Sequence, residues 1–324
     1  MSQRDGQPIL VWSAPYKFEL KAFGVNKVFA EDRGEVVLGK LKKELGEIVQ
    51  HIEPRQATKE ELLMVHTPAY VESLDKTETW QEILELKDHE FSRESATRDL
   101  KEIYEDVKLQ TGGTIQAVEI ALKTGLAASL GGGFHHAYAE KGTGFCGVND
   151  VAIAIRSAQA KGLVKKVMIV DLDFHQGDGN ASVFQKDAEV FTLSVHSEEG
   201  WPEEKEISDL DIGILSAEQH LYLDKIKEGL ELAMSRFQPE LVVYLAGSDP
   251  YEKCALPGSH FIKRPLAEMR KRDELVIDFF QSRNIPLAMV FSGGYGQDVW
   301  EVHYHAVHYM LEKAGIIKEA AVTA

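Results

Sequence analysis

Six short apolar runs, separated by stretches with helical spacing, constrain the fold of this chain more than any other feature. Strands that are apolar along their whole length suit a parallel sheet covered by helices on both faces. The predicted strands are Ile9–Ser13, Ala127–Leu130, Val167–Asp171, Val190–Val195, Leu241–Ala246 and Pro286–Phe291. The predicted helices are Lys59–Leu74, Leu109–Thr124, Val148–Gln159, Ala217–Phe237 and Pro265–Phe280. This alternation predicts a doubly wound α/β fold with a mainly parallel central sheet.

The chain contains no internal repeat, low-complexity tract or linker rich in proline or serine. We therefore expect one domain over residues 1–324, with Lys318–Ala324 as a frayed tail. Segment Thr77–Tyr104 is highly charged and only weakly periodic. It is predicted to form exposed helix and loop that could overhang a pocket.

The chain is acidic, with 52 Asp and Glu against 36 Lys and Arg and a formal net charge of −16. Such a surface repels phosphate backbones, so no nucleic-acid partner is expected. It would attract cationic substrates such as lysine-rich tails or polyamines, although solubility alone is the simpler explanation for the charge.

Cysteine content and the apolar runs predict a cytoplasmic protein. Cys146 and Cys254 are too few for a disulfide framework and lack zinc-finger spacing, so a reducing compartment is expected. The first residues lack the basic and apolar regions of a signal peptide. No apolar run reaches the ~18 residues needed to span a bilayer, so no membrane association is expected.

Polar and glycine-rich motifs follow directly after five of the predicted strands. They read GGGFHHA at 131–137, DLDFHQGDG at 171–179, SVH at 194–196, GSD at 247–249 and SGGYG at 292–296. In open α/β sheets, ligands bind at the carboxyl ends of the strands. Residues far apart in the sequence are therefore predicted to meet in one crevice.

Three of these residues form a candidate metal site. Asp173 and His175 are two positions apart, so in extended chain both side chains point the same way, and Asp249 can supply a third ligand. Three such ligands leave one position of a tetrahedral zinc open, as in catalytic sites. Fe²⁺ or Co²⁺ would also suit the mixed oxygen and nitrogen set. Each residue alone could instead cap a helix or sit satisfied in the core.

Two further motifs suggest acid–base and electrostatic chemistry beside that metal. His135 and His136 suit proton transfer because imidazole titrates near neutrality, and Asp171 and Asp178 are candidate carboxylates to orient them. Tyr295, on a glycine-rich turn, could donate its hydroxyl to a developing oxyanion. The alternatives are an exposed pair of histidines and a packing tyrosine.

Taken together, these motifs resemble the histone deacetylase family of the arginase–deacetylase fold. The resemblance rests on GGGFHHA, GFCGVND at 144–150, DLDFHQGDGN and SGGY, and it extends from about Ala14 to Leu311. The class IV branch is the most similar to this chain in two stretches, KRDELV at 271–276 and the HQGDG motif. The chain has no match to eukaryotic regulatory tails, which is more typical of a bacterial member. The resemblance implies a zinc-dependent lysine deacylase.

The resemblance also implies a role for each matching residue. Asp173, His175 and Asp249 match the zinc ligands. His136, paired with Asp178, matches the general base and acid, whereas His135, paired with Asp171, acts electrostatically. Tyr295 matches the tyrosine that polarises the carbonyl. The substrate tunnel is implied to include Gly133, Gly144, Phe145 and Trp201, and a structural potassium site is implied at Asp171, Asp173, His175, Ser194 and Val195.

One departure from the family leaves the substrate open. Where the family has a GDxLG-like stretch, this chain reads DPYEKCALPG at 249–258, so the rim of the pocket and its acyl preference differ. An acetylpolyamine amidohydrolase and a catalytically silent module that binds acyl-lysine remain alternatives. An arginase-like ureohydrolase is disfavoured by the histidine pair and Tyr295. The oligomeric state is not predicted.

Overall fold

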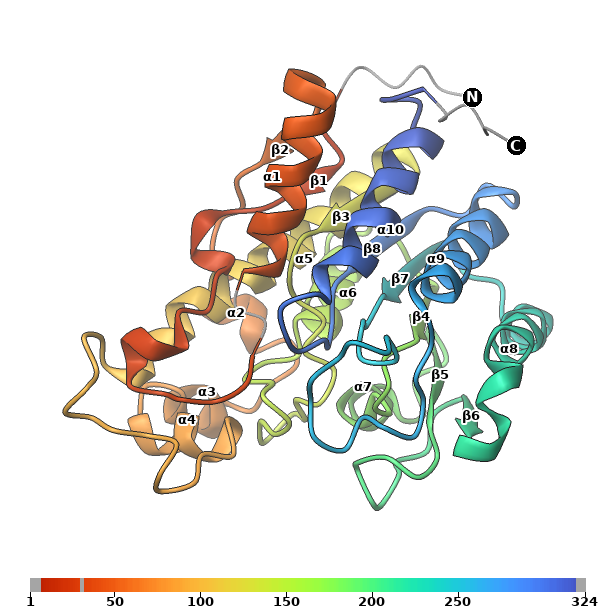
Figure 1. The fold of residues 1–324 in the computed structure, drawn as a ribbon. Coiled ribbons are helices and arrows are strands. Elements are labelled where there is room, and N and C mark those ends of the chain that lie inside the picture. Colours follow the sequence, from red (N-terminus) through yellow and green to blue (C-terminus); the bar gives the residue numbers. More distant parts are fainter. Residues whose placement is uncertain (1–6, 30–31, 319–324) are drawn as a thin grey trace.

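The computed structural model describes residues 7–29 and 32–318 and has one parallel sheet of eight strands at its centre (Figure 1). The strand order is β2-β1-β3-β8-β7-β4-β5-β6, and every neighbouring pair is parallel. The strands are β1 Leu10–Val11, β2 His51–Ile52, β3 Leu126–Ser129, β4 Val167–Asp171, β5 Val190–Ser197, β6 Leu210–Ile214, β7 Leu241–Leu245 and β8 Leu287–Val290. The predicted parallel α/β fold is confirmed.

Ten α-helices within the described residues surround the sheet. They are α1 Arg33–Leu45, α2 Lys59–Leu62, α3 Pro68–Ser73, α4 Thr77–Ile83, α5 Ile103–Thr124, α6 Asp150–Ala160, α7 Asp178–Phe184, α8 Tyr222–Arg236, α9 Leu266–Gln281 and α10 Trp300–Lys313. Helices α1, α8, α9 and α10 cover one face, and α5, α6 and α7 cover the other (Figure 1).

Alternation of side chains along each strand divides the core between these two faces. On β4, Met168 and Val170 pack with α8, α9 and α10, whereas Val167 and Ile169 pack with α5 and α6. Both sets are fully buried. A strand buried on both faces needs apolar residues at every position, which explains why the central strands read as continuous apolar runs.

The predicted helix Lys59–Leu74 is wrong as a single element, because it is divided into α2 and α3. The capping box at Thr58 and Glu61 starts α2 where the sequence predicts it. Thr67 then caps the amino end of α3, and Pro68 occupies the first turn of that helix. Proline has no amide hydrogen and is tolerated in a first turn but not inside a helix, so the chain must break before it.

The charged segment Thr77–Tyr104 is more buried than predicted. Trp80 and Ile83 on α4 are each 1% exposed and join the core beneath α5 and α6. Residues 85–99 form turns and loop, as expected. The predicted start of the helix Ala217–Phe237 is also shifted, because Ser216–Leu221 is a 3₁₀ helix and α8 begins at Tyr222.

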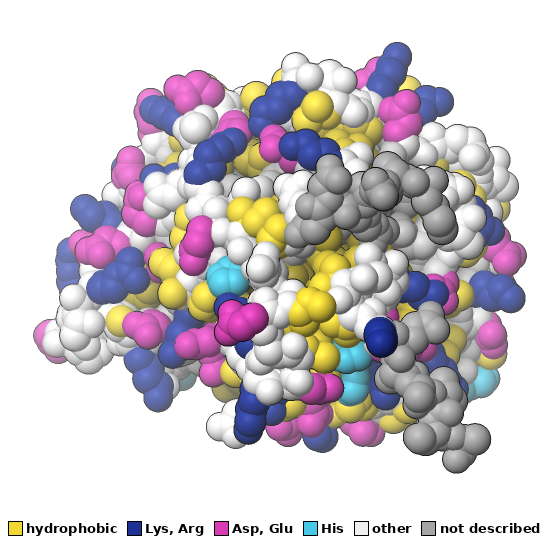
Figure 2. All heavy atoms as spheres, turned by 90° about the horizontal axis from the view of Figure 1, so that it is seen from above, with side chains coloured by type: hydrophobic (Ala, Val, Ile, Leu, Met, Phe, Trp, Pro, Cys, Tyr) yellow, Lys and Arg dark blue, Asp and Glu magenta, His cyan; other side chains and the backbone are white. Residues whose placement is uncertain are grey.

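Acidic and basic side chains are intermixed over the face shown in Figure 2. Within residues 7–29 and 32–318, no helix combines the length and apolar character needed to cross a bilayer. Most of the predicted tail Lys318–Ala324 lies outside the described residues, and so do the first six residues.

Candidate active site

The carboxyl ends of four neighbouring strands bring the predicted site residues together. Asp173 and His175 follow β4, and Asp249 follows β7. His135 and His136 follow β3, while Tyr295 lies on the turn after β8. One cavity is lined by all of these side chains; its other lining residues include Tyr16, Phe18, Phe29, Arg33, Gln110, Phe145 and Cys146.

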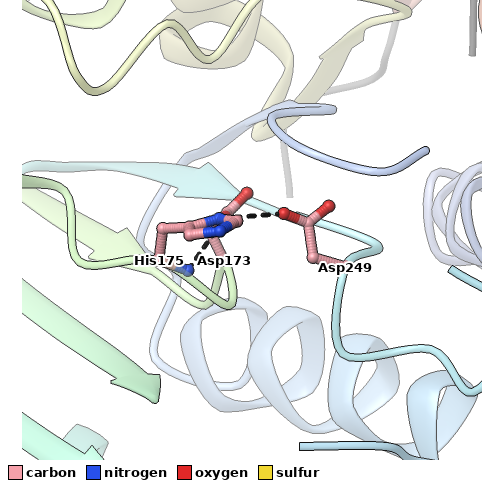
Figure 3. Close-up of side chains that lie close together, drawn as sticks. All are labelled: Asp173, His175 and Asp249. Atoms are coloured by element: carbon pink, nitrogen blue, oxygen red, sulfur yellow. Dashed lines mark hydrogen bonds and ion pairs between the residues drawn. The ribbon is translucent and has the colours of Figure 1, made fainter. Parts of the chain in front are cut away.

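Asp173, His175 and Asp249 point toward one another at this edge (Figure 3). His175 Nδ1 lies 3.2 Å from Asp173 Oδ1 and 3.1 Å from Asp249 Oδ2. One potential ligand atom from each of the three residues lies within 4.8 Å of the other two. All three residues are buried. In the described part of the chain, no other group of three His, Cys, Asp or Glu side chains converges in this way.

The chemistry of this group fits a divalent cation. Both carboxylate oxygens of Asp249 are buried, and neither accepts a well-aligned hydrogen bond, although His175 Nδ1 lies 3.1 Å from Oδ2. Burial, followed by the neighbouring charge of Asp173, raises the pKa of Asp249 to about 6. Buried carboxylates without donors are costly unless paired or bound to a metal. Two oxygens and one imidazole nitrogen are therefore poised to share one ion.

The SGGYG turn packs directly on these carboxylates. Gly293 N donates to Asp173 Oδ2 at 2.8 Å. A Cβ atom at Gly293 would lie 2.5 Å from Asp249 Oδ2 and 2.6 Å from Asp173 Oδ2, so only glycine fits. Arg33 anchors the turn by donating to the carbonyls of Ser292 at 2.7 Å and Gly293 at 2.8 Å. No motif in the sequence marks Arg33, which lies about 260 residues away from this turn along the chain.

The tandem histidines lie beside the triad, each with its own carboxylate. His135 Nδ1 is 2.7 Å from Asp171 Oδ2, and His136 Nδ1 is 2.6 Å from Asp178 Oδ1. Burial alone would lower the pKa of both rings. For His135, the charges of Asp171 and Asp173 outweigh burial and raise the pKa to about 10. Burial and the charge of His135 hold the pKa of His136 at about 4. His136 is therefore a neutral imidazole beside a charged one.

A buried network that the sequence analysis missed shapes the GGGFHHA loop. Asp150, at the start of α6, accepts from Gly133 N at 2.9 Å and from Phe134 N at 2.7 Å. Gln110 Oε1 accepts from Gly132 N at 2.9 Å. Because these backbone donors are buried, each needs an acceptor. The two side chains thus fix the loop that carries both histidines.

Aromatic rings line the approach to the triad. Phe145 and Tyr295 have ring centroids 5.8 Å apart, and Phe29, which the sequence analysis missed, lies 6.0 Å from Phe145 and 5.5 Å from Tyr295. Burial raises the pKa of Tyr295 well above its usual value, so its hydroxyl stays protonated. Phe145 has a φ of 66°, a strained backbone conformation of the kind that clusters at functional sites.

Gly144 lines the cavity beside His136, and Trp201 lies against the His136 ring without being one of the residues that line the cavity. The Trp201 ring is edge-on to His136 with centroids 4.6 Å apart. A Cβ atom at Gly144 would lie 2.6 Å from His136 Cδ2 and 2.9 Å from Trp201, so a side chain there would fill the space between the rings. Gly133 approaches the backbone of Ser292 just as closely, because a Cβ atom at this glycine would lie 2.7 Å from Ser292 Cα.

The residues of the predicted potassium site lie next to the triad on adjacent strands. The β4–β5 register places Asp171 opposite Ser194, and Val195 follows on β5. Asp171 Oδ1 accepts from Asp173 N at 3.1 Å, and Ser194 Oγ lies 2.9 Å from His196 Nδ1. The structure brings these groups together, and ion binding there stays a prediction.

The strand order and the position of the site define an α/β protein with the arginase–deacetylase fold. The crystal structure of the HDA15 HD domain superposes with a TM-score of 0.69, covering 94% of this chain and 91% of that one at 19% identity, and so shares the fold. The histone deacetylase domain family matches residues 27–311. The chain therefore belongs to the histone deacetylase family, as the motifs predict.

Curated relatives include both characterised and uncharacterised proteins. Histone deacetylase 2 of Arabidopsis thaliana is 37% identical over 248 residues, which is 75% of this chain and 63% of that protein. An uncharacterized protein of a Picosynechococcus strain is 39% identical over 206 residues, 63% of this chain and 66% of that one. The matched regions thus span just under two thirds of the length of these relatives.

Proposed function

We propose that the chain is a zinc-dependent hydrolase that removes acyl groups from the ε-amine of lysine in proteins or peptides. One observation carries the proposal: the buried triad shares its cavity with two carboxylate-paired histidines and Tyr295. Membership of the histone deacetylase family supports the same reaction class.

Asp173, His175 and Asp249 would hold the metal, with Fe²⁺ or Co²⁺ as possible replacements for zinc. When bound, such an ion acidifies a water molecule and polarises a carbonyl. The proposed role of His136 is to take the proton from that water and return it to the leaving amine. Asp178 fixes its ring, since it binds Nδ1 at 2.6 Å and leaves Nε2 for the substrate side.

The other residues orient the substrate and stabilise charge. His135, held by Asp171, supplies positive charge beside the reacting carbonyl. Tyr295 donates its hydroxyl to the oxyanion that forms when water attacks. The proposed walls around the aliphatic linker of the acyl-lysine are Phe145, Gly144, Gly133 and Trp201. Apolar contact with these walls holds the linker in place.

The remaining proposals concern the whole protein. Residues 1–324 act as one catalytic domain, and a structural potassium ion binds among Asp171, Asp173, His175, Ser194 and Val195. Both cysteines are unpaired, which supports a cytoplasmic location. No nucleic-acid or membrane partner is proposed.

A substrate panel tests the function most directly. Purified protein, stripped by a chelator and reloaded with zinc, is assayed on acetyl-lysine peptides, longer acyl-lysine peptides and acetylspermidine. We expect hydrolysis of at least one acyl-lysine peptide, lost on chelation and restored by zinc. Preference for acetylspermidine would identify an acetylpolyamine amidohydrolase instead. Binding of acyl-lysine without hydrolysis by the zinc-loaded protein would identify a silent binding module.

A further inference from the structure

The loop between β5 and β6, residues 198–209, places Trp201 against two histidines of the candidate active site. Its Trp201 ring meets the His136 ring with centroids 4.6 Å apart and lies 6.1 Å from the His175 ring. The residue is 39% exposed, so the indole covers the imidazoles on one side and meets solvent on the other. The placement of this loop therefore sets where Trp201 stands against a substrate.

Of the three apolar side chains in this loop, only that of Pro202 is buried. Ile207 is 76% exposed, and Trp201 is itself on the surface. The free energy of burial scales with the apolar area removed from water, and Pro202 and the covered part of Trp201 supply this contribution. Polar contacts also hold the loop, because Asp209 accepts from Thr192 N at 2.8 Å and Glu199 accepts from Ser216 Oγ at 3.2 Å.

A further set of polar contacts comes from Gln176, which is fully buried. Its Nε2 donates to Glu206 O at 2.7 Å and to Asp211 Oδ1 at 2.8 Å, and its Oε1 accepts from Glu206 N at 2.8 Å. Both amide hydrogens and the carbonyl oxygen are thus used. A side-chain amide has both donors and an acceptor, so it can bond to the N–H and the C=O of one residue at the same time.

Hydrogen bonds of Lys205, which precedes Glu206 in the chain, connect this anchor to the segment that carries Trp201. Lys205 donates from Nζ to Gly200 O at 2.7 Å and also to Pro202 O. Gly200 N donates in turn to Ser197 Oγ at 3.1 Å. Both ends of the segment that carries Trp201 are therefore tied down, one of them through Gln176.

We propose that Gln176 is a positioning residue that fixes Trp201 as a wall of the substrate tunnel. It adjoins His175 in the chain, so the turn that presents a proposed metal ligand also anchors the loop that carries Trp201. This inference rests on the proposed function for its effect on catalysis, but the placement of Trp201 is independent of it.

The kinetic test uses Gln176→Glu, Trp201→Ala and the double variant. Gln176→Glu keeps the size of the side chain but replaces the donors with a carboxylate facing Glu206 O and Asp211. We expect KM to rise about tenfold in each single variant, with kcat within about threefold, and no further rise in the double variant. Additive effects, an unchanged KM, or loss of bound metal with a fall in kcat would overturn the proposal.

A second measurement needs no turnover, so it separates failure of this inference from failure of the proposed function. The fluorescence of Trp201 is obtained by subtracting the signal of Trp201→Phe in each background. Acrylamide quenching of that signal should rise about twofold in Gln176→Glu as the indole is released. Unchanged quenching would contradict the proposal even if no acyl-lysine is hydrolysed.

Two variants complete the design. Gln176→Met, of similar length without donor or acceptor, replaces Gln176→Glu if the buried carboxylate prevents folding, and the same outcomes are expected. Gln159→Glu is the matched control, because Gln159, near the carboxyl end of α6, donates to Lys165 O and accepts from Arg156, away from the loop that carries Trp201. It should change neither KM nor the quenching of Trp201.

Discussion

Tyr138 donates its hydroxyl to Asp178 Oδ2 at 3.0 Å, while the other oxygen of that carboxylate lies 2.6 Å from His136 Nδ1. Burial would raise the pKa of Asp178, but the hydrogen bonds from His136 and Tyr138 and the nearby charge of His135 hold it below its usual value. Tyr138 is half-buried and extends the pair toward the surface. It is therefore a candidate for orienting the His136–Asp178 pair.

Tyr138→Phe should lower kcat about tenfold without changing metal content, because a hydrogen bond to a charged group contributes about 1.5–3 kcal/mol. The measurement is steady-state kinetics on an acyl-lysine peptide. Tyr309→Phe is the control, since it removes a similar hydrogen bond to Asp278 between α10 and α9, away from the cavity. Equal kcat in both variants would contradict the role.

The two tandem histidines should differ in their contribution to turnover. His136 is the neutral imidazole able to accept a proton, and His135 carries charge. His136→Ala should therefore reduce kcat more than His135→Ala, by at least about tenfold, within the range typical of general acid–base catalysis. Kinetics of both variants at matched metal content check this, and the reverse order would exchange the two roles.

Tyr295→Phe should keep the metal but lose most turnover. Loss of one donor to an oxyanion typically reduces kcat about 10²- to 10³-fold. The phenyl ring preserves the contacts with Phe29 and Phe145, so binding of substrate should change little. Tyr304→Phe is the control, because its hydroxyl donates to Glu44 on α1 and Tyr304 does not line the cavity. Near-wild-type kcat in Tyr295→Phe, with metal content confirmed, would remove the assigned role.

Arg272 is expected to stabilise the edge of the sheet that carries the proposed metal ligands. It is fully buried on α9, donates to Gly247 O at 2.5 Å and Ala246 O at 3.3 Å, and pairs with Asp273 at 2.7 Å. Arg272→Met would leave Asp273 buried without its partner, at a cost of about 3–5 kcal/mol. Urea unfolding of the metal-free protein measures this.

The neighbouring surface arginine provides the comparison for Arg272. Arg270 is half-exposed and pairs weakly with Glu274 at 3.9 Å on the same helix. Arg270→Met should change the free energy of unfolding by less than about 0.5 kcal/mol. If both variants lose similar stability, the carbonyl contacts of Arg272 do not stabilise the site.

An element of the fold could be predicted where its burial leaves a local pattern in the sequence. The central strands are buried on both faces, so burial leaves a continuous apolar run in the sequence. The edge strand β6 is only partly buried and includes Asp211 and Gly213, and β2 has two residues, so neither has such a pattern. In contrast, α1 has apolar residues at helical spacing, namely Val37, Leu38 and Leu41, which could have identified it.

Some site residues are likewise marked by a local sequence pattern, and others are not. Strand ends and the two-residue spacing of Asp173 and His175 predict a shared location, because strand geometry fixes where such side chains point. Arg33, Gln176 and Arg272 act through carbonyls that are far away in sequence or on another loop. Nothing local marks a residue whose partner is a distant backbone atom, so these roles emerge only from the tertiary structure.

His66 makes stability depend on pH through a buried neutral ring outside the proposed metal ligands. Its Nδ1 lies 2.9 Å from Tyr138 O, and its Nε2 accepts from Asn149 N at 2.9 Å. Burial lowers its pKa from the ordinary 6.5 to about 4, although the hydrogen bond to Tyr138 O opposes this. Both nitrogens are therefore satisfied only in the neutral form.

The sign of the effect follows from proton uptake by the two states. Between pH 6.5 and about 4 the unfolded chain binds a proton at His66 that the folded protein does not, so stability is complete above pH 6.5 and falls as the pH is lowered. From pH 7 to pH 5 this group should cost about 2 kcal/mol. His66→Gln, which cannot titrate, should lose that much less stability over the same interval.

Urea unfolding of the metal-free protein at pH 7 and pH 5 measures the difference between wild type and His66→Gln. The comparison cancels the contributions of the other titrating groups, because they are common to both proteins. His89→Gln is the matched control, since His89 is exposed on the loop after α4. If His66→Gln shows the same loss between the two pH values as wild type and His89→Gln, the ring at position 66 is protonated in the folded state, and the neutral hydrogen-bonding arrangement with Asn149 is excluded.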